Sequence, residues 1–230
     1  SKTRKVTILT KTGAKSSNTY LAQGGIAAAH APYDAAARHA KDTMEAGSLH
    51  NEWGMVRFLT ENGGPAIDAL IGEGMTFDCD ETGRLLYGLE GAHSERRIVH
   101  SGGDATGRQL VEHLLKRIRD ADVDIREHET VIELLLSVKG ECIGALAKNR
   151  EDALQAYFAA FTVIATGGCG QLYPFSTNGK NAAGDGYALA LKAGARLRDM
   201  EFIQFHPTGL YVDGAVKGLV SEAVRGEGGR

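Results

Sequence analysis

Cysteine is rare in this 230-residue sequence, and its distribution excludes two kinds of site. Only Cys79, Cys142 and Cys169 occur, far apart and without a Cys-x-x-Cys pair. An odd number at such spacing predicts neither a disulfide framework nor a zinc site, and we expect no other metal site. A reduced, cytoplasmic setting fits these cysteines best.

Long apolar runs and an excess of one charge are also lacking. No run approaches the roughly 20 apolar residues of a membrane helix, and the charged first residues do not resemble a secretory signal. The formal net charge at pH 7 is only -3. Such a balance offers no electrostatic footprint for nucleic acid or an anionic membrane, so we expect neither as a partner.

The G-x-G-x-x-G motif that usually opens a dinucleotide-binding domain is absent near the start. The sequence begins instead at what looks like the second strand of such a domain, residues 5–10. An acidic residue often ends that strand and holds the ribose. Here the corresponding positions are Thr10 and Lys11.

Glycine, in contrast, is abundant, with 30 residues against only 4 prolines. About 7% glycine is ordinary, and clusters between apolar segments suggest backbone that approaches a phosphate or a flat ring. One cluster, Ala165–Gly170, follows the apolar segment Phe161–Ile164, although a tight turn packed on a helix explains it equally well. A second, Ser16–Gly25, could offer N–H and hydroxyl groups to a pyrophosphate; composition alone favours an ordinary polar loop.

Apolar periodicity predicts a mixed α/β fold without internal repeats. The clearest helix covers residues 106–120, with Asp104 or Thr106 as its cap, and Gly63-Gly64-Pro65 should separate two other helices. The remaining helices are expected at residues 33–47, 52–61, 66–70 and 182–193. Strands or extended segments are expected at residues 5–10, 76–90, 124–129, 131–138, 142–147, 156–165 and 196–205.

Seven short motifs occur in an order that resembles one flavoprotein family, that of succinate dehydrogenase, fumarate reductase and L-aspartate oxidase. The resemblance covers nearly the whole chain. It implies an incomplete Rossmann-like FAD-binding domain at residues 1–204 and the entry to a substrate or capping domain at residues 205–230. The motifs are Ala22–Ala27, Glu90–Ser94, Asp104–Gly107, Ala165–Gly168, Ala183–Gly186, Gln204–Thr208 and Arg225–Gly229.

Two positions distinguish branches of that family. A histidine carries covalently linked FAD in the succinate dehydrogenases and respiratory fumarate reductases, and the matching residue here is Asn18, so the resemblance implies non-covalent FAD. Glu90 matches a glutamate of the aspartate oxidases, where the succinate and fumarate enzymes carry glutamine. A carboxylate there would favour the ammonium group by which aspartate differs from succinate. Without the resemblance, Glu90 is an exposed charge at a strand end.

The resemblance also implies which residues form the site. For substrate and catalysis these are Glu90, His206, Ser221 and Glu222, although a lone histidine is more often structural. For FAD they are Lys11, Asn18, Thr19, Tyr20, Leu21, Ala22, Gln23, Gly24, Gly25, Glu129, Thr130, Thr166, Gly167 and Asp185. A plain strand-end role for Glu129 stays open.

The implied reaction is FAD-dependent oxidation of L-aspartate to iminoaspartate in NAD biosynthesis. Fumarate or oxygen would accept the electrons, and a quinolinate synthase would consume the product. The family uses an arginine beyond the last motif, so we expect this chain to be an internal piece of the parent enzyme and inactive alone. Two alternatives stay open: a soluble fumarate reductase or other succinate-oxidising flavoprotein, and a non-catalytic fragment without cofactor.

Overall fold

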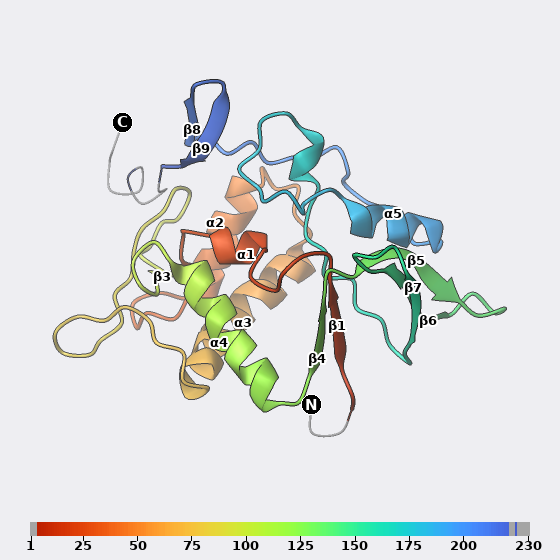
Figure 1. Ribbon diagram of the computed structural model, residues 1–230. Coiled ribbons are helices and arrows are strands. Elements are labelled where there is room, and N and C mark those ends of the chain that lie inside the picture. The colour runs from red at the N-terminus through yellow and green to blue at the C-terminus, as the bar shows by residue number, and fades with distance from the viewer. Residues whose placement is uncertain (1–3, 221–223, 225–230) are drawn as a thin grey trace. The chain divides into compact units, whose positions relative to one another are not determined.

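The computed structural model describes residues 4–220 and 224, and it divides into two compact units (Figure 1). The first unit combines the described residues up to Asn18 with Leu115–Leu219, and the second contains Thr19–Leu114 with the described residues that follow Leu219. Both contain helices and strands, which confirms the predicted α/β class. The predicted division after residue 204 concerns functional domains and stays a prediction.

Two parallel strands lie at the centre of the first unit. β1 (Thr7–Thr10) pairs with β4 (Asp124–Glu127), so that both strands end at the same edge. The short helix α5 (Asp185–Lys192) begins after Gly184, which adopts a left-handed conformation with φ of 82°. Ligands of α/β proteins bind at the carboxyl ends of parallel strands, so this edge is where a site is expected.

An antiparallel sheet completes the same unit. Its strands are β5 (Thr130–Leu136), β6 (Cys142–Lys148) and β7 (Leu154–Phe158), and α5 lies against β5 in Figure 1. The turn at Lys139-Gly140 joins β5 to β6 as predicted, with φ of 80° at Gly140. The sequence did not predict the later elements, the 3-10 turn η1 (Gly170–Leu172) and the hairpin of β8 (Gly209–Val212) and β9 (Ala215–Leu219).

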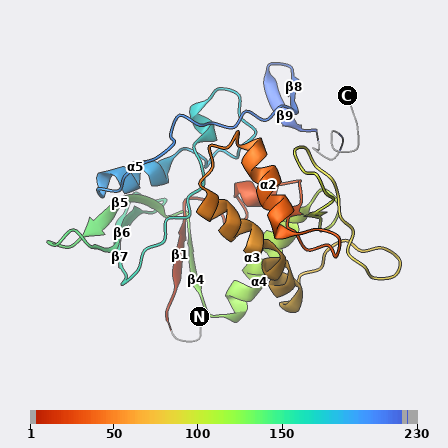
Figure 2. The ribbon, with the colours of Figure 1, turned by 180° about the vertical axis from the view of Figure 1, so that it is seen from behind.

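The second unit packs helices around a small apolar core. Helix α2 (Ala36–Ala46) lies beside α3 (Trp53–Gly72) (Figure 2). The two-residue strands β2 (Ile26–Ala27) and β3 (Ile98–Val99) pair antiparallel. Buried core residues are Ala28, Ile67, Met75, Phe77 and Val99. Complete burial of a side chain such as Ile67 contributes about 1.5–3 kcal/mol.

The predicted break at Gly63-Gly64-Pro65 is wrong, because α3 runs through it as one helix. A methyl group at Gly64 would lie 3.2 Å from the Ala29 carbonyl oxygen, so this glycine lets the helix approach the chain before α2. The helix buries Val56, Thr60, Gly64 and Ile67 at helical spacing. Packing of that stripe therefore outweighs the local cost of Pro65.

Two predicted strands are also wrong, the second only in part. Within the described residues, 76–90 forms only isolated bridges, Cys79 with Leu85 and Gly88 with Ile98. The predicted strand 156–165 is correct only at its start: β7 ends at Phe158 and Ala159 N–H still donates to the Ile143 carbonyl oxygen, but residues 160–165 form no strand, and Phe161 and Val163 are exposed. An apolar run becomes a strand only where a neighbour satisfies its backbone groups. Helix α4 (Thr106–Asp120), by comparison, has the predicted bounds. None of the helices described is both long and apolar enough to cross a membrane.

Candidate flavin and substrate site

Side chains from distant parts of the chain meet at the edge where β1 ends. Lys11 Nζ lies 2.7 Å from Asp185 Oδ2 at the start of α5. Asn181 Nδ2 donates hydrogen bonds to Thr12 Oγ1 at 2.6 Å and to the Ser16 carbonyl oxygen at 2.7 Å. These contacts hold the loop after β1 against the loop before α5, so the predicted residues Lys11 and Asp185 lie together.

Asn18 adds two further bonds between these loops. Its Oδ1 accepts from the Gly179 N–H at 2.8 Å, and its Nδ2 donates to Asn178 Oδ1 at 2.9 Å. An amide side chain can donate and accept at once, which this position uses fully. Asn18 therefore has a structural task, because its side chain joins the two loops.

The glycine-rich turn after the apolar segment packs on the first turn of α5. A methyl group at Gly186 would lie 2.0 Å from Thr166 Oγ1, so no larger residue fits without a shift. Gly184 N–H donates to the Gly168 carbonyl oxygen at 3.2 Å, and Gly167 has φ of 73°. The predicted residues Thr166, Gly167 and Asp185 are thus neighbours, with backbone exposed at a helix N-terminus where anions are favoured.

Glu129 and Thr130 lie at the end of β4 and the start of β5. Glu129 N–H donates to the Thr10 carbonyl oxygen at 3.0 Å, which extends the parallel pairing of β1 and β4 by one bond. Its carboxylate oxygen Oε2 is buried and has no hydrogen-bond partner among the described residues. Thr130 pairs with Lys148 of the neighbouring strand.

The predicted residues Thr19 to Gly25 belong to the second unit, whose boundary falls between Asn18 and Thr19. Helix α1 (Asn18–Leu21) is a single turn, closed by a bond from Ala22 N–H to the Thr19 carbonyl oxygen at 3.1 Å. Gly107 packs against it, since a methyl group there would lie 1.9 Å from the same oxygen. Gln23 Oε1 is buried and, within the part of the chain described, unpartnered.

Glu90 lies beside Gly24 and Gly25 in the same unit. Ile26 pairs with Val99, so the antiparallel register places Gly25 opposite His100. A methyl group at Gly25 would lie 3.0 Å from His100 Nε2, and one at Gly24 would lie 3.5 Å from Glu90 Oε1. The glycine pair therefore leaves room for the Glu90 carboxylate and the His100 imidazole, whose Oε1 and Nε2 atoms are 3.8 Å apart.

The Glu90 carboxylate is held in its charged form. Its side chain is 22% exposed, so solvent screens it only in part. The neighbouring His100 imidazole is the largest influence and lowers the pKa of Glu90, and the Gly25 N–H lowers it further, against the opposing effect of burial. An anion at this position suits a cationic group of a substrate.

The other predicted substrate residues belong to the first unit or lie outside the described residues. His206 lies in the first unit, where its Nδ1 accepts a bond from Thr208 N–H at 3.3 Å and contacts Thr208 Oγ1 at 3.0 Å. An accepting Nδ1 favours the tautomer with its proton on Nε2. Ser221 and Glu222 lie outside the described residues, as do Arg225 to Gly229.

The residues present fit an FAD molecule. Two of the predicted cofactor residues, Gln23 and Glu129, carry buried oxygens that lack partners among residues 4–220 and 224. Such atoms are rare in folded proteins unless a ligand or water completes them. FAD carries amide, amine and hydroxyl donors for such oxygens, and phosphates for the backbone N–H groups of glycine-rich turns.

Sequence reasoning missed several residues of these clusters. His100 contacts the Glu90 carboxylate, and Asn178, Gly179 and Asn181 hold the loop that carries Asn18. His100 could not be found from the sequence, because it is placed by a strand pairing of only two residues, too short to show a periodic pattern. The asparagines lie in a polar run before Ala182, which the sequence does show. Nothing in that run indicates that it contacts the loop after β1.

The chain is similar in sequence to L-aspartate oxidases and in structure to a fumarate reductase. L-aspartate oxidase of Bacillus subtilis (strain 168) is 47% identical over 97% of the chain and 42% of the relative. The same enzyme of Halalkalibacterium halodurans is 42% identical over 98% of the chain and 43% of the relative. A variant of E. coli quinol fumarate reductase superimposes with a TM-score of 0.91 at 29% identity, over 98% of this chain and 38% of that chain.

The chain therefore spans about two fifths of the length of these relatives. A family model described as the FAD binding domain matches residues 1–230. That match covers every cluster described above, including the two buried oxygens without partners. With this motif order, this fold and these relatives, the chain belongs to the FAD binding domain family, and FAD is its cofactor.

Proposed function

We propose that the complete protein containing this chain oxidises L-aspartate to iminoaspartate. The observation that carries the proposal is the Glu90 carboxylate, which is anionic, mostly buried and lies beside Gly24, Gly25 and His100. Similarity to L-aspartate oxidases over 97–98% of the chain supports the same substrate. A succinate-oxidising flavoprotein would gain nothing from an anion at this position.

We expect FAD to be held by Lys11, Asn18, Glu129, Thr130, Thr166, Gly167 and Asp185 and by the turn from Thr19 to Gly25. When bound, FAD would accept a hydride, which is two electrons and one proton, from the substrate α-carbon. It would then pass the electrons to oxygen or fumarate. The protein supplies binding, orientation and charge.

Glu90 would bind the α-ammonium group of aspartate through its carboxylate. An ammonium ion beside a partly buried carboxylate gains a charge-assisted hydrogen bond. Succinate has a methylene group at this position and gains nothing. His206, with its proton on Nε2, would donate to a substrate carboxylate, and Ser221 and Glu222 would line the same pocket.

The overall reaction removes two electrons and two protons from aspartate. A hydride leaves the α-carbon, a proton leaves the nitrogen, and a carbon–nitrogen double bond forms. Because iminoaspartate hydrolyses readily, we propose that a quinolinate synthase consumes it in NAD biosynthesis.

Three free cysteines, Cys79, Cys142 and Cys169, support a reducing, cytoplasmic setting.

Replacing Glu90 with glutamine in the complete flavoprotein tests this proposal. Glu90→Gln keeps the shape and removes the charge, so kcat/KM for L-aspartate should fall roughly 10- to 100-fold, the value of one charge-assisted hydrogen bond. Turnover of succinate should stay the same or rise. Steady-state kinetics with both substrates measure the change.

The matched control is Glu95→Gln, which neutralises a carboxylate five residues away that pairs with Arg38. It should leave both kcat/KM values near those of the parent. Aspartate turnover that Glu90→Gln does not alter would show that Glu90 does not select the substrate, and would favour the succinate-oxidising alternative.

A further inference from the structure

The residue proposed to select aspartate lies on a loop, residues 89–97, here called the Glu90 loop. Its base is closed by the pairing of Gly88 with Ile98, with bonds of 2.8 and 3.2 Å between their backbone groups. Between these ends, a bond of 3.4 Å from His93 N–H to the Glu90 carbonyl oxygen forms a loose turn. Local backbone bonds alone therefore give Glu90 little support.

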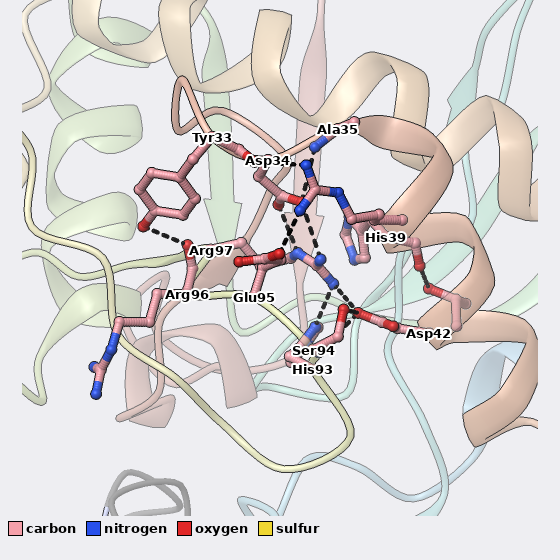
Figure 3. Close-up of polar contacts among 12 residues, drawn as sticks. Tyr33, Asp34, Ala35, His39, Asp42, His93, Ser94, Glu95, Arg96 and Arg97 are labelled. Atoms are coloured by element: carbon pink, nitrogen blue, oxygen red, sulfur yellow. Dashed lines mark hydrogen bonds and ion pairs between the residues drawn. The ribbon is translucent and has the colours of Figure 1, made fainter.

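A buried arginine at the end of the loop supplies stronger anchoring. Arg97 is 0% exposed and lies between two aspartates (Figure 3). Its Nε is 2.7 Å from Asp34 Oδ2, and its Nη1 is 2.5 Å from Asp42 Oδ2. A charge removed from water persists only when it is paired and hydrogen-bonded, so both carboxylates are required partners.

Asp42 joins this arginine to the middle of the Glu90 loop. One oxygen, Asp42 Oδ2, accepts bonds from Ser94 N–H at 2.9 Å, Ser94 Oγ at 2.8 Å and Arg97 Nη1 at 2.5 Å. Burial would raise the pKa of the Asp42 carboxyl, but the bonds from Ser94 and Arg97 outweigh it and keep the pKa low. Asp42 is therefore an anion that fixes two points of the loop to helix α2.

Apart from the Arg97–Asp34 pair, the other contacts of the loop are weaker. The Arg38–Glu95 pair has side chains 50% and 30% exposed, and exposed pairs contribute little. Tyr33 Oη donates to the Arg96 carbonyl oxygen at 3.0 Å, a single neutral bond. By number of bonds, charge and burial, Asp42 is the main support from helix α2.

We propose that Asp42 is a positioning residue for substrate selection: through Ser94 and Arg97 it fixes the Glu90 loop and thereby the Glu90 carboxylate. The inference rests on the proposed role of Glu90. Asp42 itself touches neither substrate nor cofactor in this account. Selectivity for aspartate then depends on a buried ion pair between helix α2 and the end of the Glu90 loop, as well as on the residue that meets the ammonium group.

The test uses the complete flavoprotein and compares kcat/KM for L-aspartate with that for succinate. Ser94→Ala removes one bond to Asp42 and leaves the Arg97 pairs, so the ratio should fall roughly 3- to 10-fold. Asp42→Asn should lower it further. The control is Thr43→Ala, next in sequence, whose hydroxyl donates only to the His39 carbonyl oxygen of its own helix.

Two further readouts separate positioning from loss of stability. In a Glu90→Gln background, Ser94→Ala should change the ratio no further, because it acts through Glu90. Amide hydrogen exchange of residues 89–97 should be faster in Asp42→Asn, with or without substrate, and unchanged in Thr43→Ala.

The outcomes distinguish this inference from the proposed function. If Glu90→Gln alters the ratio but Ser94→Ala and Asp42→Asn lower only thermal stability, the positioning role is wrong and the function stands. If Glu90→Gln has no effect, the proposed selection fails and the inference fails with it. An equal effect of Ser94→Ala in both backgrounds would also overturn the inference, because its action would not pass through Glu90.

Discussion

Ion pairs of similar length occur in both units of this protein, and their surroundings differ. In the first unit Lys11 and Asp185 are 2.7 Å apart, with each side chain 38% exposed. In the second unit Arg97 and Asp34 are also 2.7 Å apart, with each side chain 0% exposed. The distance is therefore the same, but the two contacts differ in access of water and in the second carboxylate, Asp42, with which Arg97 also pairs.

The difference in exposure indicates which of the two ion pairs contributes more to the stability of the fold. An exposed pair is screened and typically contributes about 0–1 kcal/mol. A buried charge has lost its hydration, so removal of its partner is far more costly. The Lys11 pair can be rearranged when a cofactor binds, whereas the Arg97 cluster must persist, which suits it to hold the Glu90 loop.

The largest effect is expected for Arg97→Met. It leaves the buried carboxylates of Asp34 and Asp42 without their cation, and unfolding free energy should fall by about 3–5 kcal/mol. Chemical denaturation of the protein and the variant measures this. A loss below about 1 kcal/mol would mean that the cluster is hydrated and resembles the Lys11 pair.

A smaller loss of unfolding free energy is expected for Gly107→Ala, and almost none for Gly168→Ala. Gly107→Ala would place a methyl group 1.9 Å from the Thr19 carbonyl oxygen and should cost about 1–3 kcal/mol through backbone shifts. Gly168→Ala in the first unit meets no atom within 4 Å and should be nearly neutral. Equal melting temperatures for the two variants would contradict the close packing of α1 on α4.

A pH-dependent effect should come from two histidines of the buried cluster. Burial, followed by the charge of Arg97, lowers the pKa values of His39 and His93. The unfolded chain, with histidine pKa values near about 6.5, then binds more protons than the folded chain as pH falls. Unfolding free energy should therefore decline as pH falls below about 6.5.

Asp34 and Asp42 do not cause this decline, because their lowered pKa values matter only well below pH 5. His39→Asn should flatten the change in stability between pH 7 and pH 5, whatever its effect at pH 7. Melting curves across this range measure the slope. An unchanged slope would mean that His39 does not contribute to the decline.

The smallest effect is expected for Lys11→Met. Because the Lys11–Asp185 pair is exposed, unfolding free energy should change by less than about 1 kcal/mol. A fall in FAD affinity would be expected in addition, since Lys11 lies at the predicted cofactor edge. Calorimetric titration with FAD and denaturation separate the two effects, and a loss of several kcal/mol would contradict the comparison.

The spacing of apolar and turn residues was enough to predict the elements that neighbouring residues in the sequence determine. Helix 106–120 has the predicted bounds because its apolar residues recur at helical spacing, and the hairpin of β5 and β6 turns at Gly140 as expected. Pro65 misled the prediction because α3 buries a stripe from Val56 to Ile67, of which Gly64 and Ile67 pack on the chain before α2. Residues 159–165 failed as a strand because strand formation depends on a neighbour, which no local pattern supplies.

The sequence predicted which residues belong to the candidate site, but not which other residues they contact. Motif order named Glu90, Gly24 and Gly25, and the structure places them side by side; their roles stay predictions. His100 and Asp42 could not be found, because the first depends on a two-residue strand register and the second on a buried contact between α2 and the Glu90 loop. Such contacts are tertiary and leave no periodic trace in the sequence.

The most direct test of the central claim is reduction of the flavin in the complete protein under anaerobic conditions. L-aspartate should bleach the visible flavin band quickly, and succinate should do so slowly. Acid precipitation should then release the FAD, since Asn18 cannot link it covalently. Rapid bleaching by succinate with none by aspartate would contradict the assignment of Glu90 and, with it, the proposed function.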